Sequence, residues 1–156
     1  MTDDTDDMPP YVDIINGALE FTIPAAHKLG ITAVEVRPGF AVTAAPIHGN
    51  SNHFGVMYAG VLFTVAEMLG GAIAIASFDN SLYYPLVKKL EIDFRKPADS
   101  DVRAEASLDD AEIARISATA DTHGKCDFTL AATVTAADGT VVAVTTGSYQ
   151  LRAHGK

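Results

Sequence analysis

The stretch from Val56 to Phe78 constrains the fold more than any other part of the sequence. It is almost entirely apolar and contains one charged side chain, Glu67. Such a stretch is either a membrane span or a helix buried in the core of a globular domain. We favour the core helix, because no Lys or Arg flanks the stretch and only about 18 residues remain if the helix starts at Gly60. We therefore expect a buried helix from about Gly60 to Ser77.

Most of the remaining sequence alternates between apolar and polar residues, as strands with one buried face do. The strands expected from this pattern cover Ile31–Val36, Phe40–Ala45, 86–95, 102–108, 126–134 and Val141–Arg152. Over 86–95 the predicted apolar face consists of Leu86, Lys88, Leu90, Ile92 and Phe94, and the alternation is irregular only at Val87 and Lys88. Turns at 37–39 and 138–139 would join neighbouring strands.

Two further helices are expected outside the apolar stretch. Asp13 can cap a first helix that Pro24 interrupts and Gly30 ends, and Asp109 with Glu112 resembles a capping box for a short second one. The expected apolar faces are Ile14, Ala18 and Phe21 in the first helix, and Ile113, Ile116 and Ala120 in the second. Short turns between strands favour an antiparallel sheet, which would wrap around the long apolar helix. This α+β arrangement is the hotdog description, although other α+β folds remain open.

Length and charge set the domain count and exclude one class of partner. The 156 residues suit one domain, which we place at 11–156 after a disordered acidic lead-in at 1–10. Four of the twenty acidic residues lie in the first seven positions, which leaves sixteen against eleven basic residues. A mildly acidic domain argues against nucleic acid as a partner. The lead-in has no signal-peptide pattern and Cys126 is the only cysteine, so we expect a cytoplasmic protein without an intrachain disulfide. We expect no membrane partner.

A sixteen-residue motif precedes and enters the apolar helix. From Asn52 the sequence reads N-H-F-G-V-M-Y-A-G-V-L-F-T-V-A-E. It resembles the phenylacetyl-CoA and hydroxybenzoyl-CoA thioesterase branch of the hotdog superfamily, whose pattern is N-x-x-G-x-x-H-G-G-x-L-x-x-L-A-[D/E]. The positions that match in register are Asn52, Gly55, Gly60, Leu62, Ala66 and Glu67. Tyr58 replaces the histidine, Ala59 the first glycine of the pair, and Val65 the second leucine.

The resemblance implies an acyl-CoA thioesterase and assigns the catalytic roles. Glu67 would be the general base or nucleophile, the N–H of Ala59 or Gly60 would polarise the thioester carbonyl, and Asn52 would position the water or the carbonyl. Gly55 and Tyr58 fall at substrate-contacting positions. The residues support these roles independently, because a carboxylate in an apolar helix is costly unless it is paired, faces water or has a shifted pKa. A structural partner for Glu67 at an oligomer interface is the alternative.

Spacing along the helix predicts how the site is assembled. Eight residues separate Ala59 from Glu67, which is about 12 Å of helix rise. Since one helix can hardly bring both groups to one carbonyl, we expect a homo-oligomer, a dimer or a dimer of dimers, with the site at a subunit interface.

The CoA end and the bound groups are predicted from charge. Arg95 and Lys96, with Lys88 or Lys89, are candidate partners for the CoA phosphates, although ordinary solvated charges explain them equally well. We expect no metal and no cofactor beyond the CoA thioester substrate. The histidines of the polar loop, His48 and His53, have no nearby carboxylate or cysteine.

Two other functions are compatible with the sequence. The string around His53 and Gly60 partly resembles hotdog dehydratases, but their glutamate would fall at Val65. A non-catalytic acyl-CoA sensor or scaffold would keep the pocket and lose the chemistry, and the replacement at Tyr58 allows this reading. The identity of the acyl group cannot be read from the sequence.

Overall fold

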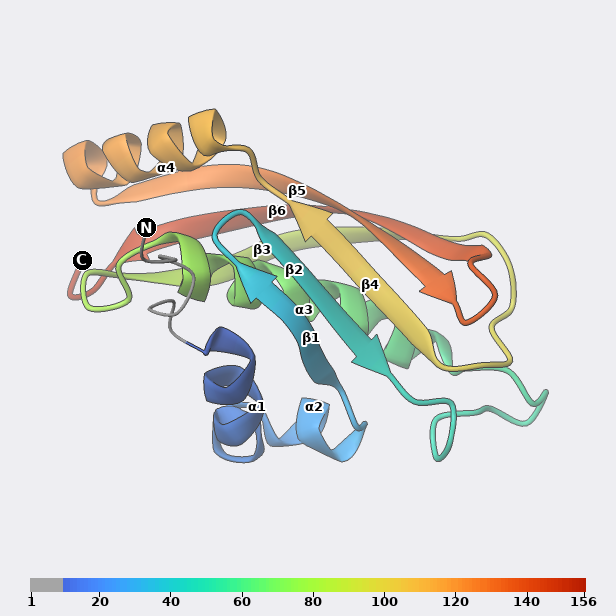
Figure 1. The fold of residues 1–156 in the computed structure, drawn as a ribbon. Helices are drawn as coiled ribbons and strands as arrows, with labels where there is room; N and C mark the ends of the chain where they lie inside the picture. Colours follow the sequence, from blue (N-terminus) through green and yellow to red (C-terminus); the bar gives the residue numbers. More distant parts are fainter. Residues whose placement is uncertain (1–9) are drawn as a thin grey trace, which may run out of the picture.

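The computed structural model describes residues 10–156, so the expectation for the acidic lead-in lies outside the described residues apart from Pro10. The chain folds into one antiparallel sheet and the helices that pack on it (Figure 1). The helices are α1 (Tyr11–Thr22), α2 (Pro24–Lys28), α3 (Ala59–Ser77) and α4 (Asp110–His123). The strands are β1 (Thr32–Arg37), β2 (Phe40–Ala45), β3 (Tyr83–Phe94), β4 (Val102–Ser107), β5 (Lys125–Ala136) and β6 (Val141–Ala153).

The sheet has six strands in the order β1-β2-β4-β5-β6-β3, and each neighbouring pair is antiparallel. It curves around α3, which contacts all six strands, while α1 and α2 lie beside β1 and α4 runs along β5 (Figure 1). The expected hotdog arrangement, a curved antiparallel sheet around one long apolar helix, is therefore confirmed.

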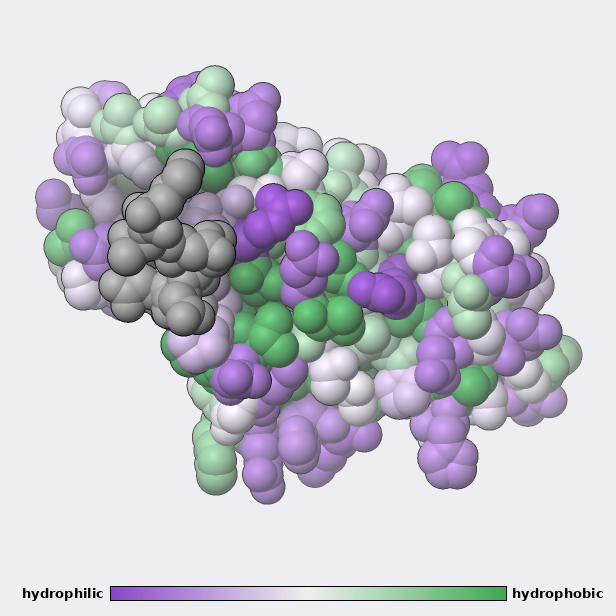
Figure 2. Space-filling view, viewed as in Figure 1, coloured by the Kyte–Doolittle hydropathy of each residue, from purple (hydrophilic) through white to green (hydrophobic). Residues whose placement is uncertain are grey.

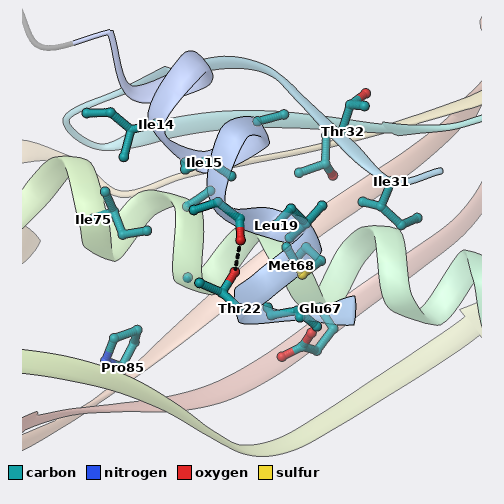
Figure 3. Close-up of a pocket in the computed structure, with 16 residues that line it drawn as sticks. Ile14, Ile15, Leu19, Thr22, Ile31, Thr32, Glu67, Met68, Ile75 and Pro85 are labelled. Carbon is teal, nitrogen blue, oxygen red and sulfur yellow. Dashed lines mark hydrogen bonds between the residues drawn. The ribbon is translucent and has the colours of Figure 1, made fainter. Parts of the chain in front are cut away.

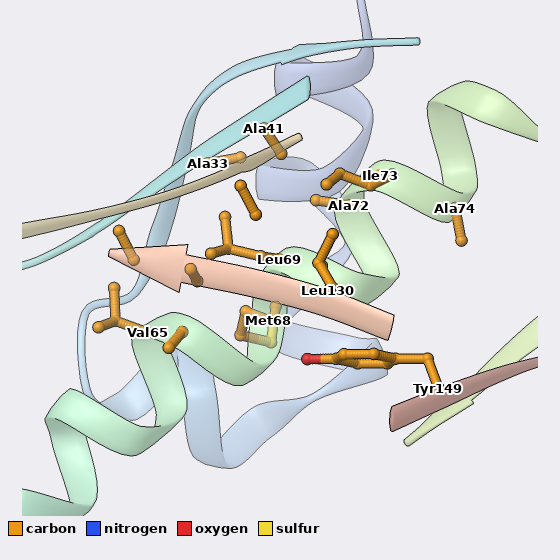
Figure 4. Close-up of a cluster of buried hydrophobic side chains, with 14 of the residues drawn as sticks. Ala33, Ala41, Val65, Met68, Leu69, Ala72, Ile73, Ala74, Leu130 and Tyr149 are labelled. Atoms are coloured by element: carbon orange, nitrogen blue, oxygen red, sulfur yellow. The ribbon is translucent and has the colours of Figure 1, made fainter. Parts of the chain in front are cut away.

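The apolar helix α3 is the centre of the core. By length and composition it could cross a membrane, but 61% of its most apolar window is buried inside the domain. Leu69 and Ile73 are fully buried and pack against the sheet, where Leu130 and Tyr149 lie (Figure 4). The hydroxyl of Thr43 on β2 also donates to a main-chain carbonyl of this helix, that of Val65, at 2.6 Å. The expectation of a core helix is confirmed, and it begins one residue before the predicted start.

Tyr149 on β6 packs unusually close to α3. A Cβ atom on Gly70 would lie 2.1 Å from a ring carbon of Tyr149, and one on Gly147 would lie 2.4 Å from the other edge of the ring. The ring also stacks on Phe128 of β5, with centroids 5.7 Å apart. The helix and the sheet can approach this closely because both glycines lack a side chain.

The first helix differs from the expectation in its start and in its buried face. It begins at Tyr11, so Asp13 lies within the first turn and caps nothing. Its buried residues are Ile15 and Leu19, whereas Phe21 is 81% exposed. The predicted stripe started one residue too early, because successive apolar residues fit two helical faces equally well. Pro24 does separate α1 from α2, as predicted.

The strand β3 lies at the edge of the sheet and contains a bulge. Its register with β6 shifts between Val87 and Lys89. Val87 pairs with the buried Tyr149 and so shares its face, while Lys88 points away and pairs with Asp127 at 2.7 Å. The assignment of Lys88 to the apolar face was therefore wrong, and the irregular alternation at these two residues marks the bulge.

The helix α4 is longer than predicted, but its start is as predicted. The side chain of Asp109 accepts a hydrogen bond from the backbone N–H of Glu112 at 2.7 Å. The return half of a capping box is absent among the described residues, because the Glu112 carboxylate pairs with Arg115 instead. Gly124, in a left-handed conformation, ends the helix.

Candidate active site

The loop before α3 is fixed by a buried asparagine that the sequence did not single out. The side-chain amide of Asn50 donates to the main-chain carbonyls of Leu29 and Pro46, at 2.7 and 2.8 Å. The main-chain carbonyl of Asn50 accepts a hydrogen bond from the backbone N–H of Tyr58 at 2.9 Å. Asn50 thereby positions Tyr58, the residue directly before α3. A single asparagine in a polar loop carries no periodic signal, so only the fold reveals this role.

Asn52 shapes the turn that contains Gly55. Its side-chain oxygen accepts from the backbone N–H groups of Phe54 and Val56, at 2.9 and 3.4 Å. Gly55 donates its N–H to the carbonyl of Asn52 at 3.0 Å and has a φ of +78°, a conformation that favours glycine. Both motif residues thus have a structural role in this turn, and Gly55 lines none of the cavities described below.

The first turn of α3 offers backbone donors. Tyr58 is its N-cap residue, and the carbonyl of Tyr58 accepts from the N–H groups of Val61 and Leu62. The N–H groups of Ala59 and Gly60 come before any intrahelical acceptor and are therefore available to a ligand. The Tyr58 ring lies over Gly60, where an added Cβ would come within 2.5 Å of it.

One open pocket of about 310 Å³ brings together four of the residues predicted from the sequence. Asn52 and Ala59 come from the loop and the helix start, and Arg95 and Lys96 from the end of β3. Arg95 pairs with Asp93 at 3.0 Å, whereas Lys96 forms no ion pair with any residue from 10 to 156. A helix N-terminus and an available ammonium group at the same pocket suit an anionic ligand.

The other cationic candidates are already paired. Lys88 contacts Asp127 and Lys89 contacts Glu91, each at 2.7 Å. Tyr58 lies outside the 310 Å³ pocket and lines a smaller hollow of about 250 Å³ with Asn52 and His53. Of the residues considered for the CoA phosphates, Lys96 is therefore the best placed.

Glu67 lies in a different cavity. This cavity has a volume of about 300 Å³ and lies between α1, α3 and the sheet (Figure 3). Its lining residues are Ile14, Ile15, Ala18, Leu19, Thr22, Ile23, Ile31, Thr32, Ala33, Thr43, Glu67, Met68, Gly71, Ala72, Ile75 and Pro85. Glu67 is the only charged residue among them, so we call it the Glu67 cavity.

The carboxylate of Glu67 is half-buried and accessible from this cavity. It pairs with no cation within residues 10–156. Every fully buried side-chain oxygen in these residues has a hydrogen-bond partner, so the unpaired oxygens of Glu67 must be exposed to solvent. Burial raises the pKa of the Glu67 carboxyl, because desolvation disfavours the charged form. A carboxylate with a raised pKa in an apolar cavity is suited to accept a proton from a bound water.

Within one chain, the predicted catalytic groups therefore lie in two separate cavities. Glu67 lies in its own cavity, while Asn52, Ala59, Arg95 and Lys96 share the other pocket. Ala59 and Glu67 are eight residues apart on one continuous helix, which is about 12 Å of rise.

The outer wall of the Glu67 cavity depends on a contact that the sequence did not predict. The side-chain amide of Asn16 on α1 donates to the carbonyl of Ala33 at 2.9 Å and accepts from its N–H at 2.8 Å. These two bonds hold α1 on the outer edge of β1. The helix itself could be predicted from its apolar residues, but its place over the cavity is a tertiary feature.

Comparison with solved structures supports the fold and the superfamily. A Pseudomonas aeruginosa protein described as of unknown function and a probable thioesterase is 39% identical, with a TM-score of 0.86 over 94% of this chain and 99% of that one. A Haemophilus influenzae thioesterase is 15% identical, with a TM-score of 0.74 over 93% and 92%. A mutant thioesterase from P. aeruginosa is 16% identical, with a TM-score of 0.73 over 91% and 94%. The latter two show the fold alone.

No curated protein matches the sequence. The resemblance to hotdog thioesterases is confirmed by the fold together with the 39% identical neighbour. The family profile described as a domain of unknown function, DUF4442, matches residues 13–151, and the chain therefore belongs to this family.

Proposed function

We propose that this protein hydrolyses an acyl-CoA-type thioester, with Glu67 as the catalytic carboxylate. The observation that carries the proposal is the position of Glu67, a half-buried carboxylate without a cationic partner among the described residues and the single charge in an apolar cavity. The 39% identical neighbour, which is described as a probable thioesterase, supports the reaction class.

In the proposed reaction, the Glu67 carboxylate takes a proton from water while the water oxygen bonds to the thioester carbonyl carbon. The carbonyl oxygen becomes negative and is stabilised by the N–H of Ala59 or Gly60. The carbon–sulfur bond then breaks, and the leaving thiolate takes the proton from Glu67. Direct attack by the carboxylate, followed by hydrolysis of the anhydride, is the nucleophilic alternative. Neither route requires a metal or a cofactor.

We further propose that two subunits complete each site. The separation of Glu67 from Ala59 along α3 favours a second copy that supplies the helix start and the pocket with Lys96. The edge strand β3 supports an assembly, because it is twelve residues long, pairs with β6 on one side and exposes Leu86, Val87 and Phe94. The unpaired edge of a strand of this length is a template for pairing with another chain.

A thiol-release assay across acetyl-, octanoyl-, palmitoyl- and phenylacetyl-CoA tests the activity. We expect turnover with at least one of them, and a loss of at least about 10²-fold in kcat for Glu67→Gln, because the amide cannot accept the proton. The variant should keep the oligomeric mass and a cooperative melting transition. Near-native turnover in a well-folded Glu67→Gln variant would remove Glu67 from the mechanism. Binding of acyl-CoA without turnover by the unchanged protein would support the sensor instead.

A further inference from the structure

The Glu67 cavity has a lining that selects for one kind of group. Aliphatic side chains of Ile, Leu, Ala, Met and Pro form most of its surface, and no aromatic ring lines it. Its polar side chains other than Glu67 are three threonines, and two of their hydroxyls already donate to main-chain carbonyls: Thr22 to Ala18 and Thr43 to Val65. Such a cavity stabilises a flexible hydrocarbon by burying its surface and offers little to a polar group.

The cavity extends along α3 from the carboxylate. Glu67, Gly71 and Ile75 are spaced by four residues and therefore lie on one face of the helix. Figure 3 shows Glu67 on one side of the cavity, with Ile75, Ile14 and Pro85 on the other. The helix rises about 12 Å between Glu67 and Ile75, so the cavity has room for a chain longer than two carbons.

Gly71 keeps the middle of this path open. A Cβ atom built at this position meets no other atom within 4 Å, although Gly71 lies in the centre of a packed helix. Its neighbours on the same wall, Met68 and Ala72, are buried. Glycine in a helix interior costs stability relative to alanine, and no packing within this chain requires a glycine at this position.

We infer that the Glu67 cavity binds the acyl group of the thioester, that this acyl group is aliphatic, and that Gly71 determines the acyl length accepted. The inference rests on the proposed thioesterase function. The thioester carbonyl lies at Glu67, and the hydrocarbon runs past Gly71 towards Ile75, under α1. The CoA end then points away from this cavity, towards the 310 Å³ pocket of the second copy, which Lys96 lines.

The test replaces Gly71 by leucine, because an added Cβ meets no atom within 4 Å and the larger side chain would extend from there into the cavity. Gly17→Leu is the matched control. Gly17 is also an interior helical glycine whose added Cβ meets nothing within 4 Å, but it is exposed on α1 and does not line the cavity. Both variants replace a helical glycine by a good helix former, so a general effect on folding would appear in both.

We expect Gly71→Leu to lower kcat/KM for octanoyl-CoA by at least about 10-fold and to leave the value for acetyl-CoA within about 3-fold. Gly17→Leu should leave both values within about 3-fold of the unchanged protein. Equal effects of Gly71→Leu on the two substrates, or no effect on either, would overturn the inference.

Failure of the proposed function is distinguishable from failure of this inference. If the unchanged protein hydrolyses none of the acyl-CoAs, the thioesterase proposal fails, and calorimetric titration with octanoyl-CoA decides the cavity question. Binding that is lost in Gly71→Leu and kept in Gly17→Leu would support the cavity as the acyl site. Absence of binding, or equal binding by both variants, would overturn it.

Discussion

The phenol of Tyr149 on β6 donates a hydrogen bond to the main-chain carbonyl of Glu67 on α3, at 3.4 Å. The ring reaches this turn of the helix because Gly70 and Gly147 leave room for it. Burial, and secondly the charge of Glu67, raises the pKa of Tyr149 well above its ordinary value, so the phenol stays a donor across the working pH range. The sheet therefore fixes the helical turn that holds the candidate catalytic carboxylate.

Replacing either of two adjacent glycines in α3 by alanine should change the free energy of unfolding in opposite directions. Gly70→Ala places a methyl group 2.1 Å from a Tyr149 ring carbon and should cost at least about 2 kcal/mol in unfolding free energy. Gly71→Ala meets nothing within 4 Å and should gain about 0.5–1 kcal/mol through helix propensity. Chemical denaturation of the two variants measures both effects. A stable Gly70→Ala protein would contradict the close packing of Tyr149 on α3.

The raised pKa of Glu67 predicts a pH-dependent cost to stability. A group with a raised folded-state pKa binds its proton more tightly in the folded protein, so it favours folding below its unfolded pKa and loses that contribution as pH rises through the folded value. Glu67→Gln should therefore be more stable than the unchanged protein near pH 8, and the difference should vanish by about pH 4. Melting temperatures across this range provide the measurement. A destabilised Gln variant at pH 8 would indicate that Glu67 is ionised and held by a cationic partner.

The amide of Asn16 should hold α1 over the Glu67 cavity. Asn16→Ala removes both bonds to Ala33 and leaves that edge of β1 to solvent, which should cost about 1–3 kcal/mol. Hydrogen exchange of the α1 amides should speed up in this variant. Glu20→Ala, an exposed position on the same helix, is the control and should change neither quantity. Unchanged exchange in Asn16→Ala would show that apolar packing alone holds the helix.

The sequence predicted the parts of the fold that have a strong local pattern. The apolar stretch with Glu67 became α3, and strict alternation located the strands to within a few residues. Patterns that fit two different buried faces were less informative. The apolar residues between Ile14 and Leu19 fit two helical faces, and only packing against β1 and α3 selects the one with Ile15.

The candidate site was predictable where a motif described it and not where the tertiary structure builds it. Asn52, Ala59 and the cations after β3 were named from the sequence, and they meet in one pocket because Met57 and Lys96 are tied to neighbouring strands and loops by backbone bonds. No sequence motif indicated the Glu67 cavity under α1. It depends on how α1 settles on β1 through Asn16, a contact across seventeen residues.

Complementation between two inactive variants tests the central claim, hydrolysis at a site shared by two subunits, most directly. Glu67→Gln lacks the carboxylate, and a variant with Asn52→Ala and Lys96→Ala disables the other pocket. Co-expressed with different affinity tags, they form mixed oligomers in which one of two sites per dimer is intact. The purified mixed species should recover about half of the unchanged specific activity per dimer, while each variant alone shows almost none. Mixed oligomers as inactive as their parents would place both groups in the same chain and contradict the shared site.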